Sequence, residues 1–87
     1  MVERVTSCGS EQITSLGSSV GLAAIPVNAG WAIIKPRGAP INLRLHGGTA
    51  TTADMQIPTD TPVEVTSKLA DVRMIGAGAT VDVWYFG

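Results

Sequence analysis

The sequence holds one histidine, His46, and one cysteine, Cys8, which are the first candidates for acid–base or nucleophilic chemistry. A catalytic histidine needs a carboxylate that orients its ring and a nucleophile beside it. Asp54 and several serines are present, but their spacing does not assemble them around His46. Cys8 lies in a Ser/Gly-rich stretch without a histidine that could activate a thiolate. We interpret His46 as a solvated side chain at a strand end and Cys8 as a small buried or semi-buried residue.

Phosphate and metal chemistry find no better support in the pattern. The segment 76–79 (GAGA) lacks the third glycine of a dinucleotide-binding loop, and a strand-like segment follows it instead of a helix. The seven acidic residues form no close pair of the kind that glycosidases or calcium loops use. The sequence therefore predicts a protein that is not an enzyme and that has no cofactor and no metal site.

Three aromatic residues, Trp31, Trp84 and Phe86, could stack on a sugar or a base. Stacking platforms for single-stranded nucleic acid also need a basic groove. Here the six basic residues are scattered and the net charge is −1, so we expect no nucleic-acid partner. Sugar sites add several polar side chains, and few accompany these rings. We favour packing of the three aromatics in the core or in a subunit interface, because such residues are enriched in both places.

The last expected strand, over residues 79–87, positions two of these aromatic residues. Alternation along a strand places Val81, Val83 and Tyr85 on one face and Asp82, Trp84 and Phe86 on the other. The first face suits a core, and the second suits a second subunit. If that second face is covered, Asp82 needs a hydrogen-bond donor such as Arg73 or Arg44 from across the sheet. The alternative is that Asp82 lies at the solvated end of the strand.

The length and composition of the chain limit the size of its core and the means of stabilising it. A chain of 87 residues makes one small domain with a limited core, and a single cysteine excludes an internal disulfide. Oligomerisation is the remaining means of adding buried surface. Hydrophobic residues make up 45% of the chain, yet no apolar run approaches the roughly 20 residues that cross a bilayer. The first four residues show no start of a signal peptide, and we expect no membrane partner.

Ten glycines and five prolines divide the chain into short segments without helical periodicity. Residues 1–12 are expected to be an N-terminal strand or extended arm, interrupted at 9–12, and residues 13–87 a single β domain. Glycines 76 and 78 predict a hairpin that pairs 72–75 with 80–86. The fold class is therefore all-β: a small, jelly-roll-like antiparallel β-sandwich of about eight short strands without significant helix. The other expected strands are 20–25, 31–35 (stopped by Pro36), 41–46, 54–57 and 63–66.

Over residues 13–86 the order of these segments resembles small all-β virion proteins of tailed bacteriophages, in particular capsid cement or decoration proteins. The resemblance is one of pattern and is carried by 15–22 (SLGSSVGL), 30–34 (GWAII), 38–44 (GAPINLR), 49–53 (TATTA), 55–58 (MQIP), 69–75 (LADVRMI) and 78–85 (GATVDVWY).

The resemblance implies a structural protein, made in the host cytoplasm, that binds the outside of the capsid shell as a dimer or trimer. Its partners would be itself and the major capsid protein. A neck, tail or fibre-base component of the virion is the alternative, followed by a carbohydrate-binding module. We expect self-association through Trp31, Trp84 and Phe86. The expected capsid contacts are Val2, Arg4, Val5, Asn42, Arg44 and His46.

Overall fold

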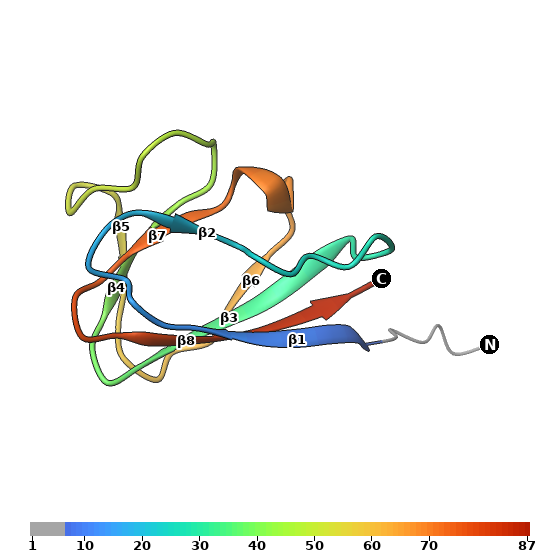
Figure 1. Ribbon diagram of the computed structural model, residues 1–87, viewed down its shortest axis with the longest axis horizontal. Coiled ribbons are helices and arrows are strands. Elements are labelled where there is room, and N and C mark those ends of the chain that lie inside the picture. The colour runs from blue at the N-terminus through green and yellow to red at the C-terminus, as the bar shows by residue number, and fades with distance from the viewer. Residues whose placement is uncertain (1–6) are drawn as a thin grey trace.

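Eight β-strands and one short 3₁₀ helix make up the regular structure of residues 7–87, which are the residues that the computed structural model describes (Figure 1). The all-β class and the expected number of strands are thereby confirmed. In chain order the elements are β1 (Ser7–Ile13), β2 (Val20–Gly21), β3 (Trp31–Arg37), β4 (Ile41–Arg44), β5 (Met55–Ile57), β6 (Val63–Val65), η1 (Leu69–Asp71), β7 (Arg73–Ile75) and β8 (Thr80–Phe86).

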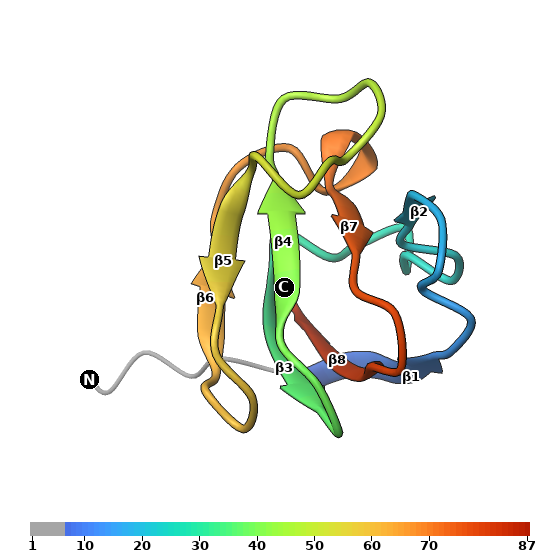
Figure 2. The ribbon, with the colours of Figure 1, turned by 90° about the vertical axis from the view of Figure 1, so that its left-hand side faces the viewer.

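The strands form two four-stranded sheets in which all neighbours are antiparallel. One sheet has the order β1-β8-β3-β6 and is called here the β8 sheet. The other has the order β2-β7-β4-β5 and is called the β7 sheet. Figure 2 shows the strands of the β7 sheet side by side, with β5 at one edge and β2 at the other.

Both sheets contribute to one hydrophobic core because their strands alternate buried and less buried residues. In β8, Val81, Val83 and Tyr85 are fully buried, as the alternation predicts. In β4, Ile41 and Leu43 are buried in the same way. The remaining members of the core cluster are Ile13, Leu16, Ala32, Ile34, Ile57, Val65, Leu69, Val72, Met74 and Ala79.

The hairpin predicted at Gly76 and Gly78 is wrong, although the turn itself is present. Ala79 N–H donates to the Gly76 carbonyl at 3.0 Å, and Gly78 has a φ of 81°. However, β7 pairs with β2 and β4 whereas β8 pairs with β1 and β3, so the turn leads from one sheet to the other. A Cβ atom on Gly76 would lie 2.7 Å from the Pro40 carbonyl oxygen, which leaves no room for a side chain at this crossing.

Other strand boundaries also differ from expectation. Gly9 to Gln12 continue β1, with a register shift between Ser7 and Gly9, instead of breaking the strand. The strand expected over 20–25 is limited to β2. Pro36, expected to stop a strand, lies within β3 opposite Val81. It follows the last β3–β6 pair, which joins Ile34 to Val63, so its missing N–H removes no bond from that ladder.

Candidate protein-binding surface

The outer face of the β8 sheet carries the large side chain with the most unusual exposure. Trp84 is 58% exposed, although it lies in β8, between β1 and β3. Cross-strand pairing places Ser10 and Ile33 directly opposite it, and Ile33 in turn lies opposite Glu64 of β6. Residues paired in this way share a face. A row of side chains with Trp84 in a central strand therefore crosses the whole sheet.

A depression of about 160 Å³ lies beside Trp84 and is lined by Ile33, Lys35, Pro62, Asp82 and Trp84. These five residues are called here the Trp84 face. Its apolar area is bordered by a cationic and an anionic side chain. That combination of an aromatic residue, a shallow hollow and bordering charge is typical of a surface that binds another protein.

Asp82 has a donor, but not one of those that the sequence suggested. Arg37, at the end of β3, contacts its carboxylate with Nε at 2.6 Å and donates from Nη2 at 3.1 Å. Gln12 of β1 donates from Nε2 at 3.2 Å. Arg73 and Arg44 belong to the other sheet, so the suggested pairing across the sheet is wrong. The carboxylate is therefore tied to the strands on both sides of β8.

Trp31 and Phe86 contact each other instead of standing free. Their ring centroids are 4.4 Å apart and the planes differ by 20°, which is a stacked arrangement. Both are half-buried, and the two residues face each other in the β3–β8 ladder. Of the three aromatics predicted to form an interface, Trp84 is thus the one with most of its surface exposed. Trp31 and Phe86 extend the same face toward the end of β8.

The residues predicted as capsid contacts on β4 serve a nearby loop. Asn42 donates from Nδ2 to the carbonyl oxygens of Asp54, at 2.9 Å, and Thr52, at 3.4 Å. Arg44 donates from Nε to the Gly47 carbonyl at 2.5 Å and pairs through Nη1 with the Asp54 carboxylate at 3.3 Å. These side chains face away from the core, as predicted, and they hold the loop 45–54 that joins β4 to β5.

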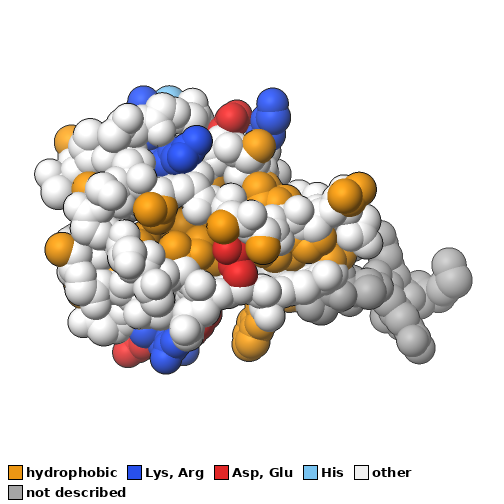
Figure 3. All heavy atoms as spheres, in the orientation of Figure 1, with side chains coloured by type: hydrophobic (Ala, Val, Ile, Leu, Met, Phe, Trp, Pro, Cys, Tyr) orange, Lys and Arg blue, Asp and Glu red, His pale blue; other side chains and the backbone are white. Residues whose placement is uncertain are grey.

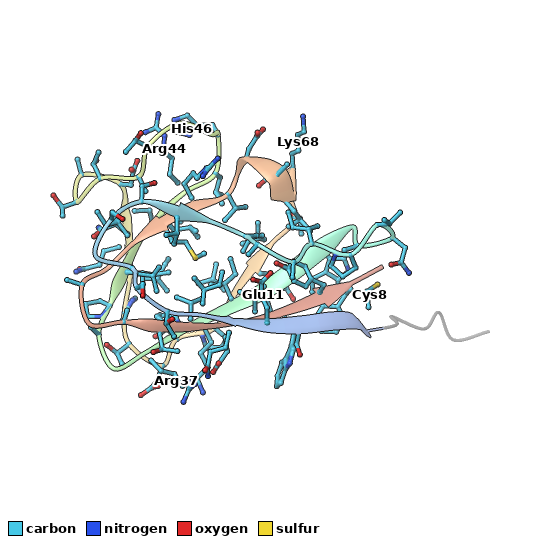
Figure 4. All side chains as sticks on the ribbon, viewed as in Figure 1. Cys8, Glu11, Arg37, Arg44, His46 and Lys68 are labelled. Carbon is cyan, nitrogen blue, oxygen red and sulfur yellow. The ribbon has the colours of Figure 1, made fainter. Side chains whose placement is uncertain are left out.

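Asp54 is the acceptor on which this loop depends. Its Oδ2 accepts the Thr51 N–H at 2.8 Å. That backbone hydrogen bond is the main cause that holds the pKa of Asp54 below its usual value; partial burial opposes it, and Arg44 adds to it. His46 is exposed in the same loop, and Figure 4 shows it beside Arg44 at the end of the molecule away from Arg37. Val2, Arg4 and Val5, also predicted as capsid contacts, lie outside the described residues.

A carboxylate between the sheets was missed by the sequence analysis. Figure 4 shows Glu11 pointing into the space between the two sheets. It accepts the N–H groups of Ala23, at 3.3 Å, and Ala24, at 2.8 Å, and it accepts the hydroxyl hydrogen of Tyr85. The available signal was Tyr85 on the buried face of β8, because a buried tyrosine hydroxyl generally needs a partner. Glu11 thereby links β1 of one sheet to the segment that follows β2 of the other.

Within residues 7–87, no cluster of side chains typical of thiol or metal chemistry is present. The Cys8 thiol contacts the Asn28 carbonyl oxygen at 3.9 Å, far from the loop that holds His46 (Figure 4). Within this part of the chain, no three His, Cys, Asp or Glu side chains gather closely enough to hold a metal ion. The same residues include no helix with the length and apolar character needed to span a bilayer.

Comparisons with known proteins give no relative for this chain. No family model matches the sequence, and neither a curated protein nor a solved structure matches it.

Proposed function

We propose that this chain is a structural binding protein that self-associates through the Trp84 face. The observation that carries the proposal is Trp84 itself, which is 58% exposed on a central strand beside a depression of about 160 Å³. Tryptophan is enriched among residues that dominate binding energy, and the side chains around it on the sheet face can exclude water from such a contact. The proposal includes no catalytic step, no cofactor, no nucleic acid and no membrane.

The occupant that we favour is a second copy of the same chain. Lys35 and Glu64 lie on the same outer face next to Ile33: Lys35 is two residues further along β3, and Glu64 lies opposite Ile33 in β6. In residues 7–87, neither side chain has an oppositely charged group within ion-pair distance. A pairing with two-fold symmetry lets each copy offer both charges, so that Lys35 of one protomer meets Glu64 of its partner.

We also propose that the two sheets form a jelly-roll-like sandwich. The support is the strand order, in which β1 pairs with β8, β2 with β7, β3 with β6 and β4 with β5. Such nested pairs arise when one long antiparallel hairpin is folded over on itself into two sheets. Double-sheet jelly rolls of eight strands occur in viral capsid and lectin domains.

Within this proposal, the cellular role is that of a cement or decoration protein on the capsid surface of a tailed phage. A homo-oligomer that binds only the assembled shell stabilises the shell by mass action, and many identical copies multiply a modest contact. The resemblance in the order of segments supports this role. Its expected partner is the major capsid protein, and a neck, tail or fibre-base position in the virion is the alternative.

The decisive experiment measures self-association of the Trp84→Ala variant by sedimentation equilibrium. If Trp84 is at the centre of the interface, its truncation costs about 2 kcal/mol or more, which weakens the dimer about 30-fold. Val27→Ala is the matched control because Val27 is an exposed hydrophobic residue in the turn before β3 and is not one of the five residues of the Trp84 face. A monomeric wild-type chain, or equal association of the Trp84→Ala variant and the wild type, would contradict the proposal.

A charge exchange then tests whether the partner is a second copy. Lys35→Glu and Glu64→Lys are each expected to weaken association, because like charges then meet across the interface. The double variant restores both pairs in a two-fold dimer and is expected to recover most of the affinity. If the double variant is weaker than either single variant, the two-fold arrangement is wrong even if Trp84 is essential.

A further inference from the structure

Arg73 occupies a central position on the outer face of the β7 sheet, on the side of the molecule that the proposed interface does not use. It lies in β7, and its register partners are Gly21 of β2 and Arg44 of β4. The adjacent Met74 is fully buried in the core, so Arg73 faces outward. Glycine, arginine and arginine thus form one row across three neighbouring strands.

The guanidinium group of Arg73 lies close against the bare backbone of Gly21. A Cβ atom at residue 21 would be 3.1 Å from Arg73 Nη1 and 3.3 Å from Cζ. Any side chain here would therefore push the guanidinium away. The Arg73 Nε atom is buried, and within residues 7–87 it has no hydrogen-bond partner. A charged guanidinium whose buried Nε has no acceptor is incompletely stabilised, so an anion that contacts the Nη atoms, which are not among the buried unpaired atoms, would stabilise the charge.

The neighbouring arginine increases this imbalance. Arg44 lies directly opposite Arg73, and like charges in that position repel each other. The charge of Arg44 is balanced by Asp54 at 3.3 Å. In the described part of the chain, no carboxylate lies within ion-pair distance of Arg73, Asp71 included. Figure 3 shows basic side chains and the histidine along the upper rim of the molecule, and Figure 4 places Arg44, His46 and Lys68 at that end.

We propose that Arg73 is the anchor of an oxyanion-binding site on the outer face of the β7 sheet. The ligand group is a phosphate or a carboxylate, because two oxygens of either group match the paired Nη donors of a guanidinium. Gly21 provides the space in which the guanidinium lies, and Arg44 adds a second positive charge. The site is independent of self-association, because it lies on the sheet opposite to the Trp84 face.

The test is a titration of the folded chain with inorganic phosphate, followed by ¹H–¹⁵N NMR of the Arg73 Nε–H group and of the backbone amides. Sodium chloride at equal ionic strength is the control for screening. The expected result is a saturable shift of the Arg73 Nε–H and Gly21 signals, which the chloride control does not produce. A linear response to phosphate, or the same shift in chloride, would overturn the proposal.

Substitutions separate a specific site from general attraction. Arg73→Gln is expected to weaken phosphate binding about tenfold or more, and Arg73→Lys to recover only part of it, because lysine lacks the paired donors. Arg37→Gln is the matched control on the other sheet and should leave binding unchanged. If Arg73→Gln does not fold, Gly21→Ala provides a second route, since it displaces the guanidinium. Binding that survives both Arg73→Gln and Gly21→Ala would overturn the proposal.

A parallel titration with acetate identifies the source of the oxyanion. Tighter binding of phosphate assigns the site to phosphate groups, whereas tighter binding of acetate assigns it to carboxylates such as the acidic side chains of a partner protein. Absence of binding for both anions contradicts the inference. None of these readouts depends on the oligomeric state, so their failure would leave the proposed self-association standing.

Discussion

The outer faces of the two sheets use their polar side chains for different purposes. On the β7 sheet, Asn42 and Arg44 bind groups of the loop 45–54 of the same chain. On the β8 sheet, Asp82 is tied to neighbouring strands, while Trp84 projects from the middle of the face. The comparison shows that an outward polar residue on a strand is not necessarily available to a partner, since its hydrogen bonds can already be engaged.

The largest expected effect on stability comes from Glu11, whose carboxylate links the two sheets. Glu11→Ala removes the acceptor of the Ala23, Ala24 and Tyr85 hydrogen bonds. We expect a loss of about 3 kcal/mol in the free energy of unfolding, because three donors lose a charged partner. Urea denaturation checks the value, and hydrogen exchange shows whether both sheets are affected.

Gln12→Ala is the control for this change, because Gln12 lies beside Glu11 in β1 but faces outward toward Asp82. We expect it to cost less than about 1 kcal/mol. If Glu11→Ala lowered the free energy of unfolding no more than Gln12→Ala does, the link that Glu11 makes between the two sheets would not contribute to stability. The contrast between the inward Glu11 and the outward Gln12 would then need another explanation.

An effect of intermediate size is expected to distinguish Arg44 from Arg37, the arginines that form ion pairs within residues 7–87. Arg44→Met retains most of the side-chain packing but removes the 2.5 Å hydrogen bond to Gly47 and the contact with Asp54. We expect it to cost about 2 kcal/mol in unfolding free energy and to make the loop 45–54 more accessible to proteases. Arg37→Met should cost only about 0.5 kcal/mol, because the Arg37 side chain is 45% exposed. Equal losses in urea denaturation would remove the distinction between the two faces.

The smallest expected effect on folding stability is the loss of the Tyr85 contribution at alkaline pH. Burial and, secondly, the hydrogen bond to Glu11 raise the pKa of Tyr85 well above its usual value of 10.0. The neutral hydroxyl therefore contributes stability that is fully present below a pH of about 10. This contribution is lost as the pH rises further, because the unfolded chain releases the proton first.

Tyr85→Phe measures this contribution directly. At neutral pH we expect the variant to be about 1 kcal/mol less stable than the wild type, and we expect the difference to shrink above pH 10. Tyr85 is the single tyrosine of the chain, so the ultraviolet absorbance of tyrosinate reports its ionisation alone. A difference that grew with pH, or ionisation at the ordinary pKa in the folded protein, would refute the role given to Glu11.

The sequence pattern correctly predicted the features that depend only on residues close together in the chain. The alternation in β8 and β4 identified the buried residues correctly, because each side chain in a strand must face either the core or the outside. The exposure of Trp84 followed from the same alternation. The all-β class followed from the density of glycine and proline between short apolar segments.

The pairing of strands that are distant in sequence could not be predicted in the same way. The turn at Gly76 to Gly78 exists, but a turn does not determine whether the strands beside it belong to one sheet. The donor for Asp82 was wrong for the same reason, since choosing between Arg37 and Arg73 requires the strand order. Glu11 was overlooked because its partners come from three separate parts of the chain. Nothing in the spacing of the arginines showed that Arg44 and Arg73 would face each other.

The pairing of β1 with β8 has a consequence for biosynthesis. Glu11 and Tyr85, which meet between the sheets, are 74 residues apart in sequence. A chain still emerging from a ribosome holds β1 and β3 without the strand that fits between them, and Trp84 is part of that missing strand. The Trp84 face therefore comes into existence only when β8 has been synthesised and inserted. Neighbouring nascent chains on one messenger RNA are thus unable to associate through this face before each of them has folded.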